Sequence, residues 1–393
     1  MTPAARLQAA IEIVDQVIES ARDDGPPADA LVTRYFKHRR YAGSKDRRAV
    51  RELVFRAIRH VAERPENGRS TMLALAQVEP ELLDLFGQPR GPEPLVNDEE
   101  GTVPESGTVP EWLVPELSPL LTRGEWPALL ERAPLDLRVN AARASRDVLM
   151  GQFEQAQATP LSPWGIRLPA DSRIDQHPAF QNGLIEVQDE GSQLIALACA
   201  PRDGEAVLDL CAGAGGKSLA LAAAAPGATI LATDTNRARI SKLTPRAARA
   251  GAEIESRLLN PPNELGDLTD WRGKADLVLV DAPCSGSGTW RRNPEGRWRL
   301  TSARLDRLIA VQERLLDVAA ELVRPGGRLV YAVCSLLSRE GAGQIEHFLS
   351  RHSSWNSQEL PIPAGRADGA GRLLTPAHDG TDGFFVARLG RPC

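Results

Sequence analysis

The stretch EAVLDLCAGAGGKSLALAAAA, residues 205–225, reads as a buried strand, a glycine-rich turn and the beginning of a helix. Gly213, Gly215 and Gly216 allow the backbone to turn tightly and to approach a ligand before the helix begins. The chain then alternates apolar strands with helical segments, which indicates βαβ units and a parallel sheet that helices cover on both faces. The further predicted strands are ATILATD (228–234), ADLVLVD (275–281) and RLVYAV (328–333).

Upstream of this region three sequence patterns follow one another. Apolar residues first recur at helical spacing. The next stretch is rich in Pro, Gly and acidic residues and contains GTVPE twice, at 101–105 and at 107–111, and after it short predicted strands alternate with a helix. The 393 residues allow more than one hydrophobic core. We therefore expect four regions, namely an all-helical domain at 1–88, a flexible insertion with short helices at 89–130, a small α+β connector at 131–185 and an α/β domain at 186–393.

Composition and cysteine spacing exclude several classes of protein. The chain is 42% hydrophobic and 25% charged with a formal net charge of −5, which is typical of a soluble globular protein. No apolar run reaches the ~18 residues of a membrane helix and no secretory signal pattern is present, so we expect a cytoplasmic protein with no membrane partner. The five cysteines are scattered without CxxC pairs, which argues against disulfides and against a metal site.

The glycine-rich turn indicates a nucleotide-like ligand but matches neither common fingerprint. A P-loop would need glycine where the chain has Cys211, and a GxGxxG motif fails because position 218 is Ser. Asp234 ends the second predicted strand, 25 residues after Asp209, where a carboxylate can accept hydrogen bonds from ribose hydroxyls. This pattern suits NAD and S-adenosylmethionine equally, and Asp234 could instead be a helix N-cap.

The ends of the two later strands favour one of these cofactors. The third strand ends at Asp281 and is followed by Pro283, Cys284 and Ser285, and the fourth is followed by Cys334. We expect the two thiols to meet at the carboxyl edge of the sheet. Methylation of a pyrimidine at C5 needs such groups, because a thiolate that adds to C6 makes C5 nucleophilic enough to take a methyl group. A second thiol can assist the elimination that frees the product.

Five ordered blocks of the sequence resemble the RNA 5-methylcytosine methyltransferases of the RsmB/Nop family. The connector sequence PLDLRVN (134–140) is similar to the segment that precedes the catalytic domain in that family, and SKDRRAVRELVFRAIRH (44–60) is similar to the NusB-like RNA-binding domain of RsmB proteins. The five blocks are VQDEGSQLIA (187–196), LDLCAGAGGK (208–217), DAPCSGSGTWRRNPEGRW (281–298), LVYAVCSLLSREG (329–341) and DGFFVARL (382–389).

The resemblance implies a Rossmann-like class I methyltransferase domain with an N-terminal all-helical NusB-like domain and a small α+β connector. It implies that Cys334 is the nucleophile, that Cys284 assists product release and that Asp281 holds the edge of the cytosine and lines the cofactor site. Asp234 would hold the ribose of S-adenosylmethionine. The loop that would wrap this cofactor consists of Cys211, Ala212, Gly213, Ala214, Gly215, Gly216 and Lys217.

The chain departs from the family pattern at three places. The family's loop reads CAAPGGK, so Gly213 and Ala214 stand where Ala and Pro are usual, and we expect a more flexible cofactor loop. Val333 replaces the usual Thr before the nucleophile. The acid that contacts adenine is absent, with only Asn260 at about its place.

Two arginine-rich stretches are candidates for RNA contacts. Residues 34–69 hold twelve Lys and Arg against four Asp and Glu, which indicates either a phosphate-binding surface or an ordinary solvated helix face. In TWRRNPEGRWRL (289–300) arginines alternate with tryptophans, and this mixture suits the binding of single-stranded RNA. The alternative for the second stretch is a loop whose tryptophans pack inward, above all Trp298.

Small-subunit ribosomal RNA is the substrate that the NusB-like resemblance favours. Alternatives with the same chemistry are transfer RNA and large-subunit ribosomal RNA. Two further alternatives belong to other classes of protein, namely a non-catalytic RNA-binding ribosome-assembly factor and a nicotinamide-dependent dehydrogenase. Methylation of DNA cytosine is disfavoured because Ser285 follows Cys284, and methylation of an adenine amino group is disfavoured because the chain reads DAPC at 281–284.

Overall fold

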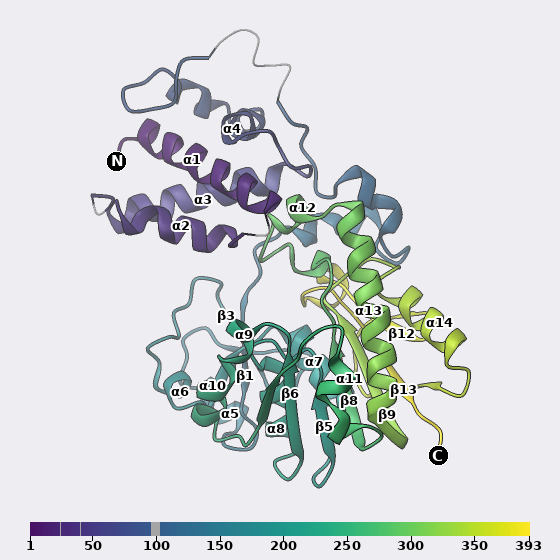
Figure 1. Ribbon diagram of the computed structural model, residues 1–393. Coiled ribbons are helices and arrows are strands. Elements are labelled where there is room, and N and C mark those ends of the chain that lie inside the picture. Colours follow the sequence, from purple (N-terminus) through teal and green to yellow (C-terminus); the bar gives the residue numbers. More distant parts are fainter. Residues whose placement is uncertain (24, 40, 96–102) are drawn as a thin grey trace. The chain divides into compact units, whose positions relative to one another are not determined.

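The computed structural model of the protein describes residues 1–23, 25–39, 41–95 and 103–393 (Figure 1). The chain forms two compact units, and each unit consists of segments that are separated in the sequence. The helical unit comprises Met1–Leu117, Arg123–Glu131 and Thr289–Ser302. The second unit comprises Ser118–Thr122, Arg132–Gly288 and Ala303–Cys393.

The N-terminal α-helices α1 to α4, together with Trp298 from a later segment of the chain, build the helical unit around one apolar core (Figure 1). Helix α1 begins after Thr2, whose side-chain oxygen accepts a hydrogen bond from the N–H of Ala5, with Pro3 at its first position. Asn67 caps α4 in the same way through the N–H of Ser70. The helices are α1 (Pro3–Arg22), α2 (Ala28–Lys37), α3 (Ser44–His60) and α4 (Gly68–Ala76), and the 3₁₀ helices are η1 (Pro80–Leu85), η3 (Glu111–Glu116) and η4 (Arg123–Leu129).

The predicted flexible insertion is only partly described. Residues 96–102 lie outside the described residues, and with them the first two residues of the first GTVPE copy. The chain that follows is attached to the end of α3, because Val61 forms a β-bridge with Ser106 and the N–H of Gly107 donates to the carbonyl of His60.

In the second unit a small antiparallel sheet precedes the large one. Its strand order is β2-β3-β1-β4, and β4 pairs with β1. The apolar side chains of these strands and of α5 share a core. The elements are β1 (Leu135–Val139), α5 (Arg146–Met150), β2 (Gln157–Ala158), β3 (Gly165–Leu168), α6 (Pro178–Gln181) and β4 (Ile185–Val187).

The large sheet has the order β11-β12-β13-β9-β8-β5-β6-β7, with β10 paired to β13. Pairing is parallel from β9 through β8, β5 and β6 to β7. The strands are β5 (Ala206–Asp209), β6 (Thr229–Asp234), β7 (Glu255–Leu258), β8 (Ala275–Asp281), β9 (Val323–Val333), β10 (Asn356–Gln358), β11 (Arg366–Asp368), β12 (Gly371–Leu374) and β13 (Phe384–Gly390).

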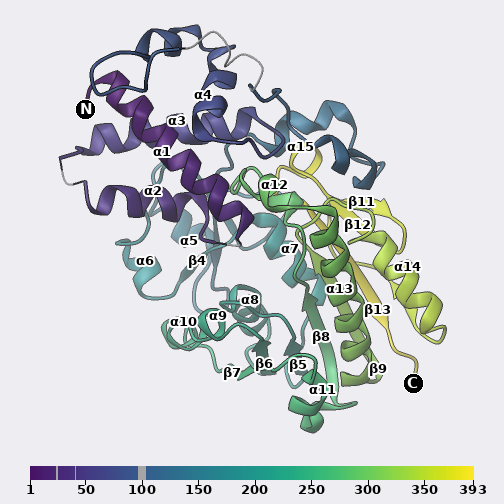
Figure 2. The same cartoon turned by 45° about the horizontal axis from the view of Figure 1, so that its top comes forward.

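Helices flank this sheet, and the long α13 runs beside β8 and β9 in both views (Figures 1 and 2). The apolar side chains of α7 and α8 pack with those of the central strands. The helices are α7 (Glu190–Cys199), α8 (Gly216–Ala224), α9 (Arg237–Ile240), α10 (Leu243–Ala250), α11 (Glu264–Asp267), α12 (Gly296–Arg299, in the helical unit), α13 (Ser302–Leu322), α14 (Ala342–Arg351) and α15 (Pro376–Asp379).

The predicted α/β architecture is confirmed, and the structure changes two of its details. The sheet is not parallel throughout, because β13 runs antiparallel to β9 and carries an antiparallel edge. Between β6 and β7 the helical segment is divided into two helices, α9 and α10. Pro245 explains where the second helix begins, since proline lacks an N–H and is tolerated in the first turn of a helix.

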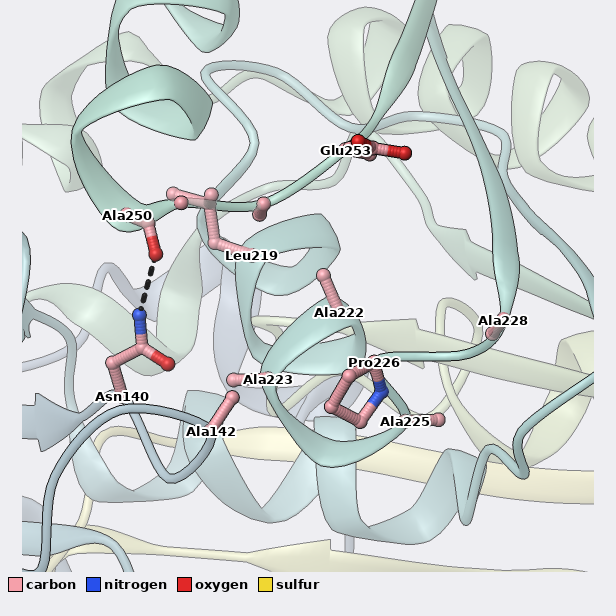
Figure 3. A pocket seen from close by; sticks show the side chains of 12 residues that line it. Asn140, Ala142, Leu219, Ala222, Ala223, Ala225, Pro226, Ala228, Ala250 and Glu253 are labelled. Carbon is pink, nitrogen blue, oxygen red and sulfur yellow. Dashed lines mark hydrogen bonds between the residues drawn. The ribbon is translucent and has the colours of Figure 1, made fainter.

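A cavity of about 360 Å³ opens between the end of β1 and the C-terminal ends of α8 and α10 (Figure 3). Small side chains from α8 line it, and Asn140 donates to the carbonyl of Ala250 at its side. None of the predicted site residues lines this cavity. Within the described ranges, no helix is long and apolar enough to cross a membrane, and no cluster of three or more His, Cys, Asp or Glu could hold a metal ion.

Candidate active site

The two thiols that the sequence places at strand ends lie next to each other. Cys334 follows the last residue of β9, and Cys284 lies in the loop that leaves β8. Because β8 and β9 pair in parallel, with Asp281 opposite Ala332, their carboxyl ends meet at one edge of the sheet. The Sγ atoms of Cys284 and Cys334 are 3.3 Å apart. The predicted convergence of the two sulfur atoms is therefore present in the structure.

The surroundings of Cys284 keep its thiol neutral. The hydrogen bond to Cys334, burial, and the nearby charges of Cys334 and Glu340 together raise the pKa of the Cys284 thiol well above its usual range. Cys284 therefore stays protonated at neutral pH, and its S–H can donate to the sulfur of Cys334.

Hydrogen bonds hold the loops that carry the thiols. The N–H of Ala282 donates to the carbonyl of Ala332 at 2.9 Å, and the N–H of Gly288 donates to the carbonyl of Cys334 at 3.0 Å. The hydroxyl of Ser287 accepts from the N–H of Leu336 at 2.8 Å. The Cys284 loop is thus attached to the Cys334 loop on both sides of the thiol.

The glycine-rich turn between β5 and α8 has the conformation of a ligand-binding loop. Gly213 and Gly215 have φ angles of 58° and 81°, which favour glycine. A Cβ atom on Gly215 would lie 2.0 Å from the Leu243 side chain, so the close approach also requires glycine. The loop is held by the N–H of Gly213, which donates to Asp234 at 2.7 Å, and by Arg246, which donates to the carbonyl of Ala214. These contacts restrain the loop at Gly213 and Ala214, the two positions where the family usually has Ala and Pro.

Asp234 is buried at the end of β6, beside the glycine-rich turn. One carboxylate oxygen accepts from the N–H of Gly213 and the other from the N–H of Asn236, both at 2.7 Å. Since each oxygen has two lone pairs, each can accept one more hydrogen bond. The N-cap of α9 is Asn236, whose side chain accepts from the N–H of Arg239, so the alternative role of Asp234 as helix cap is not the one observed.

Asp281 and Lys217 join the cofactor loop to the thiol edge. The Lys217 ammonium donates to the Asp281 carboxylate at 2.7 Å and lies 5.6 Å from the centre of the Phe384 ring. Burial alone would lower the pKa of Lys217, but the Asp281 carboxylate outweighs burial and raises it. Lys217 is therefore a cation that fixes the position of Asp281.

Three carboxylates end neighbouring strands and make this edge of the sheet acidic. Asp209 is fully buried, accepts from the Ser218 hydroxyl at 2.7 Å, and has one oxygen without a partner among the described residues. Burial, with the charges of Asp281 and Asp234, raises the pKa of Asp209 to about 7 against the effect of Ser218. Burial and the same carboxylates also raise the pKa of the Cys211 thiol well above its usual range, so this thiol stays neutral. An acidic, glycine-lined edge suits a cationic ligand.

Of the two interpretations of the 289–300 stretch, the structure shows the inward-packed one for both tryptophans and for Arg297, and the RNA contact is wrong for these three side chains. Trp290, Arg297 and Trp298 are each about 1% exposed. Arg297 donates to the main-chain carbonyls of Ile58 and Thr108, and Trp298 donates its indole N–H to the carbonyl of Val61. The reason is that Trp298 belongs to the core of the helical unit, and that Arg297 and Trp298 satisfy carbonyls at the end of α3.

The other basic stretch keeps its cations at the surface. Arg34, Lys37, Lys45 and Arg48 are all exposed on α2 and α3. This placement agrees with both interpretations of the 34–69 stretch, a phosphate-binding surface or a solvated helix face.

The sequence interpretation missed Glu340 and Gln312, and it gave Ser285 and Ser335 no role. Glu340 is fully buried and accepts hydrogen bonds from Ser285, Ser335 and Gln312. A usable signal was present in the sequence, because Glu340 lies in the same block as Cys334 (329–341), and a buried carboxylate needs specific partners.

The sheet order, the glycine-rich turn after β5 and the carboxylates at the strand ends define a Rossmann-like methyltransferase domain. A family model described as 16S rRNA methyltransferase RsmB/F matches residues 196–390. The methyltransferase domain of the chain, over these residues, belongs to the RsmB/Nop family.

Curated relatives and solved structures agree with this assignment. The chain is 35% identical over 295 residues to Ribosomal RNA small subunit methyltransferase B of Erwinia tasmaniensis and 33% identical over 291 residues to that of Pasteurella multocida. Each match covers 71% of this chain and 66% and 64% of the two relatives, so the chain spans just under two thirds of their length.

Two solved structures have the same fold. A methyltransferase homolog protein from Pyrococcus horikoshii is 26% identical, with a TM-score of 0.60 over 70% of this chain and 92% of its own. The crystal structure of PH0851 is 23% identical, with a TM-score of 0.76 over 99% of both chains, and shows the fold of the whole chain.

Proposed function

We propose that this protein transfers a methyl group from S-adenosylmethionine to C5 of a cytosine in RNA, and that its substrate is small-subunit ribosomal RNA. The observation that carries the proposal is the pair of sulfur atoms 3.3 Å apart at the ends of β8 and β9. The names of the curated relatives support the choice of substrate. An enzyme with this substrate would act in the cytoplasm.

The residues at the sheet edge fit the cofactor. S-adenosylmethionine supplies an electrophilic methyl group on a positively charged sulfur. The loop from Cys211 to Lys217 has the glycine conformations that let a ligand approach the backbone, and Asp234 keeps acceptor capacity for ribose hydroxyls. The three carboxylates of the strand ends favour the positive charge.

Cys334 is the nucleophile in this proposal, and Asp281 binds the edge of the base. The thiolate of Cys334 adds to C6 of a cytosine that has left its stack, and the ring electrons shift to C5, which then takes the methyl group. Asp281, fixed by Lys217, accepts a hydrogen bond from the exocyclic amine of the cytosine. The product is released when C5 loses its proton and the bond between C6 and Cys334 breaks.

Cys284 is placed to take that proton. The hydrogen bond and the charge of Cys334 are among the influences that raise the pKa of Cys284. Both are lost when the Cys334 sulfur is bonded to carbon, so Cys284 loses its proton more readily in the adduct than in the free protein and can act there as the base for elimination.

The test compares three cysteine variants in the full chain with labelled S-adenosylmethionine and ribosomal RNA. Cys334→Ala should abolish both methyl transfer and the covalent adduct on a denaturing gel. Cys284→Ala should still form the adduct but release product slowly, so that adduct accumulates. Cys393→Ala removes an exposed cysteine outside the site and should behave as the unmodified protein. Equal loss of adduct in the first two variants would contradict the assigned roles.

The same assay discriminates the alternatives. RNA that contains 5-fluorocytidine traps the adduct, so small-subunit, large-subunit and transfer RNA can be compared side by side. Preferential trapping of transfer or large-subunit RNA would keep the chemistry and change the substrate. Binding of ribosomal RNA without any methyl transfer would favour the non-catalytic assembly factor.

A further inference from the structure

Glu340 is a buried carboxylate beside the thiol pair. It lies between β9 and α14 and is 0% exposed. No ion pair to Glu340 is present among the residues that the structure describes. An ionised carboxylate buried without a cation is costly unless hydrogen bonds replace its hydration.

Four hydrogen bonds fill the acceptor positions of this carboxylate. Oε1 accepts from the N–H of Ser285 at 2.8 Å and from the side-chain amide of Gln312 at 2.9 Å. Oε2 accepts from the hydroxyls of Ser285 and Ser335, both at 2.5 Å. A carboxylate offers about four lone-pair positions, so none is left unused.

These contacts connect the two catalytic loops to a single group. Ser285 directly follows Cys284, and Ser335 directly follows Cys334. The position of Glu340 itself is fixed, because the Tyr331 hydroxyl on β9 donates to its main-chain carbonyl at 2.8 Å. Gln312 on α13 also donates to the carbonyl of Pro283. The thiol loops are therefore attached through Glu340 to the sheet and to a long helix.

We propose that Glu340 is a positioning residue that holds the Cys284 loop and the Cys334 loop at one spacing, so that the two thiols act as a pair. This inference rests on the proposed function for its effect on turnover, but the spacing of the thiols is a property of the RNA-free protein. Since a misplacement of about 1 Å at a reacting group can cost about 100-fold in rate, release of either loop should slow the reaction strongly.

The negative charge of Glu340 gives the proposal a second, independent consequence. It is one of the influences that raise the pKa of the Cys284 thiol. A neutral side chain at position 340 should therefore let Cys284 ionise at lower pH. A group that only stabilised the fold would not produce this shift.

The experiment uses Glu340→Gln in the full chain, with Glu346→Gln as the matched control on the exposed face of α14. An amide has one acceptor oxygen and cannot accept from four donors. We expect kcat for RNA methylation to fall about 100-fold while the KM for S-adenosylmethionine is unchanged. In the RNA-free protein, alkylation of Cys284 by iodoacetamide, followed by mass spectrometry, should shift to lower pH. The control should change neither.

Four outcomes decide between the proposal and its alternatives. Methylation and alkylation profiles equal to those of the unmodified protein would overturn the proposal, as would lower thermal stability with an unchanged alkylation profile. If Glu340→Gln does not fold, Ser335→Ala is the second variant, because it removes the hydrogen bond between Glu340 and the Cys334 loop without changing the charge. Full activity in Ser335→Ala would overturn the proposal. If the unmodified protein shows the pH-dependent alkylation but methylates no RNA, the proposed function fails and the role of Glu340 is still measured.

Discussion

Two arginine-rich segments of the helical unit have similar composition and opposite environments. In 289–300 the Arg297 guanidinium is 1% exposed and donates to main-chain carbonyls, whereas in 34–69 the cations Arg34 and Arg48 are exposed. The difference shows that arginine next to tryptophan does not by itself indicate RNA binding. A guanidinium with five donors can equally satisfy the carbonyls at a helix end.

The largest expected effect is that of Arg297→Ala. This change leaves the carbonyls of Ile58, Thr108 and Pro294 without their donor in a buried place. We expect the free energy of unfolding of the helical unit to fall by about 3–5 kcal/mol, because each buried carbonyl that loses its donor costs about 1–3 kcal/mol. Chemical denaturation followed by circular dichroism measures it. A loss under about 1 kcal/mol would show that the Arg297 contacts are not structural.

Trp298→Phe tests the same segment with a smaller change. The variant keeps an aromatic ring in the core but loses the indole N–H that donates to the carbonyl of Val61 at 3.1 Å. We expect a loss of about 1–3 kcal/mol from the unsatisfied carbonyl and the reduced volume. Tryptophan fluorescence and thermal unfolding would report it, and unchanged stability would contradict the structural role.

Arg299→Gln should have a weaker effect because Arg299 is only partly buried. Its guanidinium donates to the carbonyls of Gly25 and Pro26 between α1 and α2. A loss of about 1 kcal/mol is expected, since the freed carbonyls can be hydrated in part. Hydrogen exchange of the α1–α2 connection would be faster in the variant, and equal exchange rates would show that Arg299 does not hold this turn.

The double variant Arg34→Gln with Arg48→Gln should leave stability within about 0.5 kcal/mol, because both side chains are exposed and neither makes a hydrogen bond or an ion pair with the residues that the structure describes. If these cations contact phosphates, the slope of log affinity against log salt should fall by about 0.7 for each lost contact with single-stranded RNA. Fluorescence anisotropy with a labelled RNA fragment at several salt concentrations measures the slope. An unchanged slope would show that Arg34 and Arg48 lie on an ordinary solvated helix face. The two arginine-rich segments would then not differ in function.

Residues whose position follows from a strand end could be predicted from the sequence. Cys284, Cys334, Asp281 and Asp234 fall near the carboxyl ends of apolar strands, and the parallel pairing of those strands brings Cys284 to Cys334. Local pattern and sheet geometry suffice for such residues.

Residues whose environment depends on distant parts of the chain could not be predicted. Arg297 donates to the carbonyls of Ile58 and Thr108, and no local sequence pattern indicates hydrogen-bond partners that are so distant along the chain. The four donors of Glu340 come from two loops and from α13, so its role is visible only when these elements are folded together. The antiparallel edge of the sheet was missed for the same reason, since β13 is the last strand and pairs back with β9.

The placement of Trp298 in the core of the helical unit has a consequence for synthesis of the protein. N-terminal domains often fold while the rest of the chain is still being made. Here the first 131 residues leave the ribosome with a core that lacks one of its large side chains, and translation must proceed through β5, β6, β7 and β8 before that side chain arrives. The core of the helical unit therefore stays incompletely packed during synthesis until most of the parallel strands have been made.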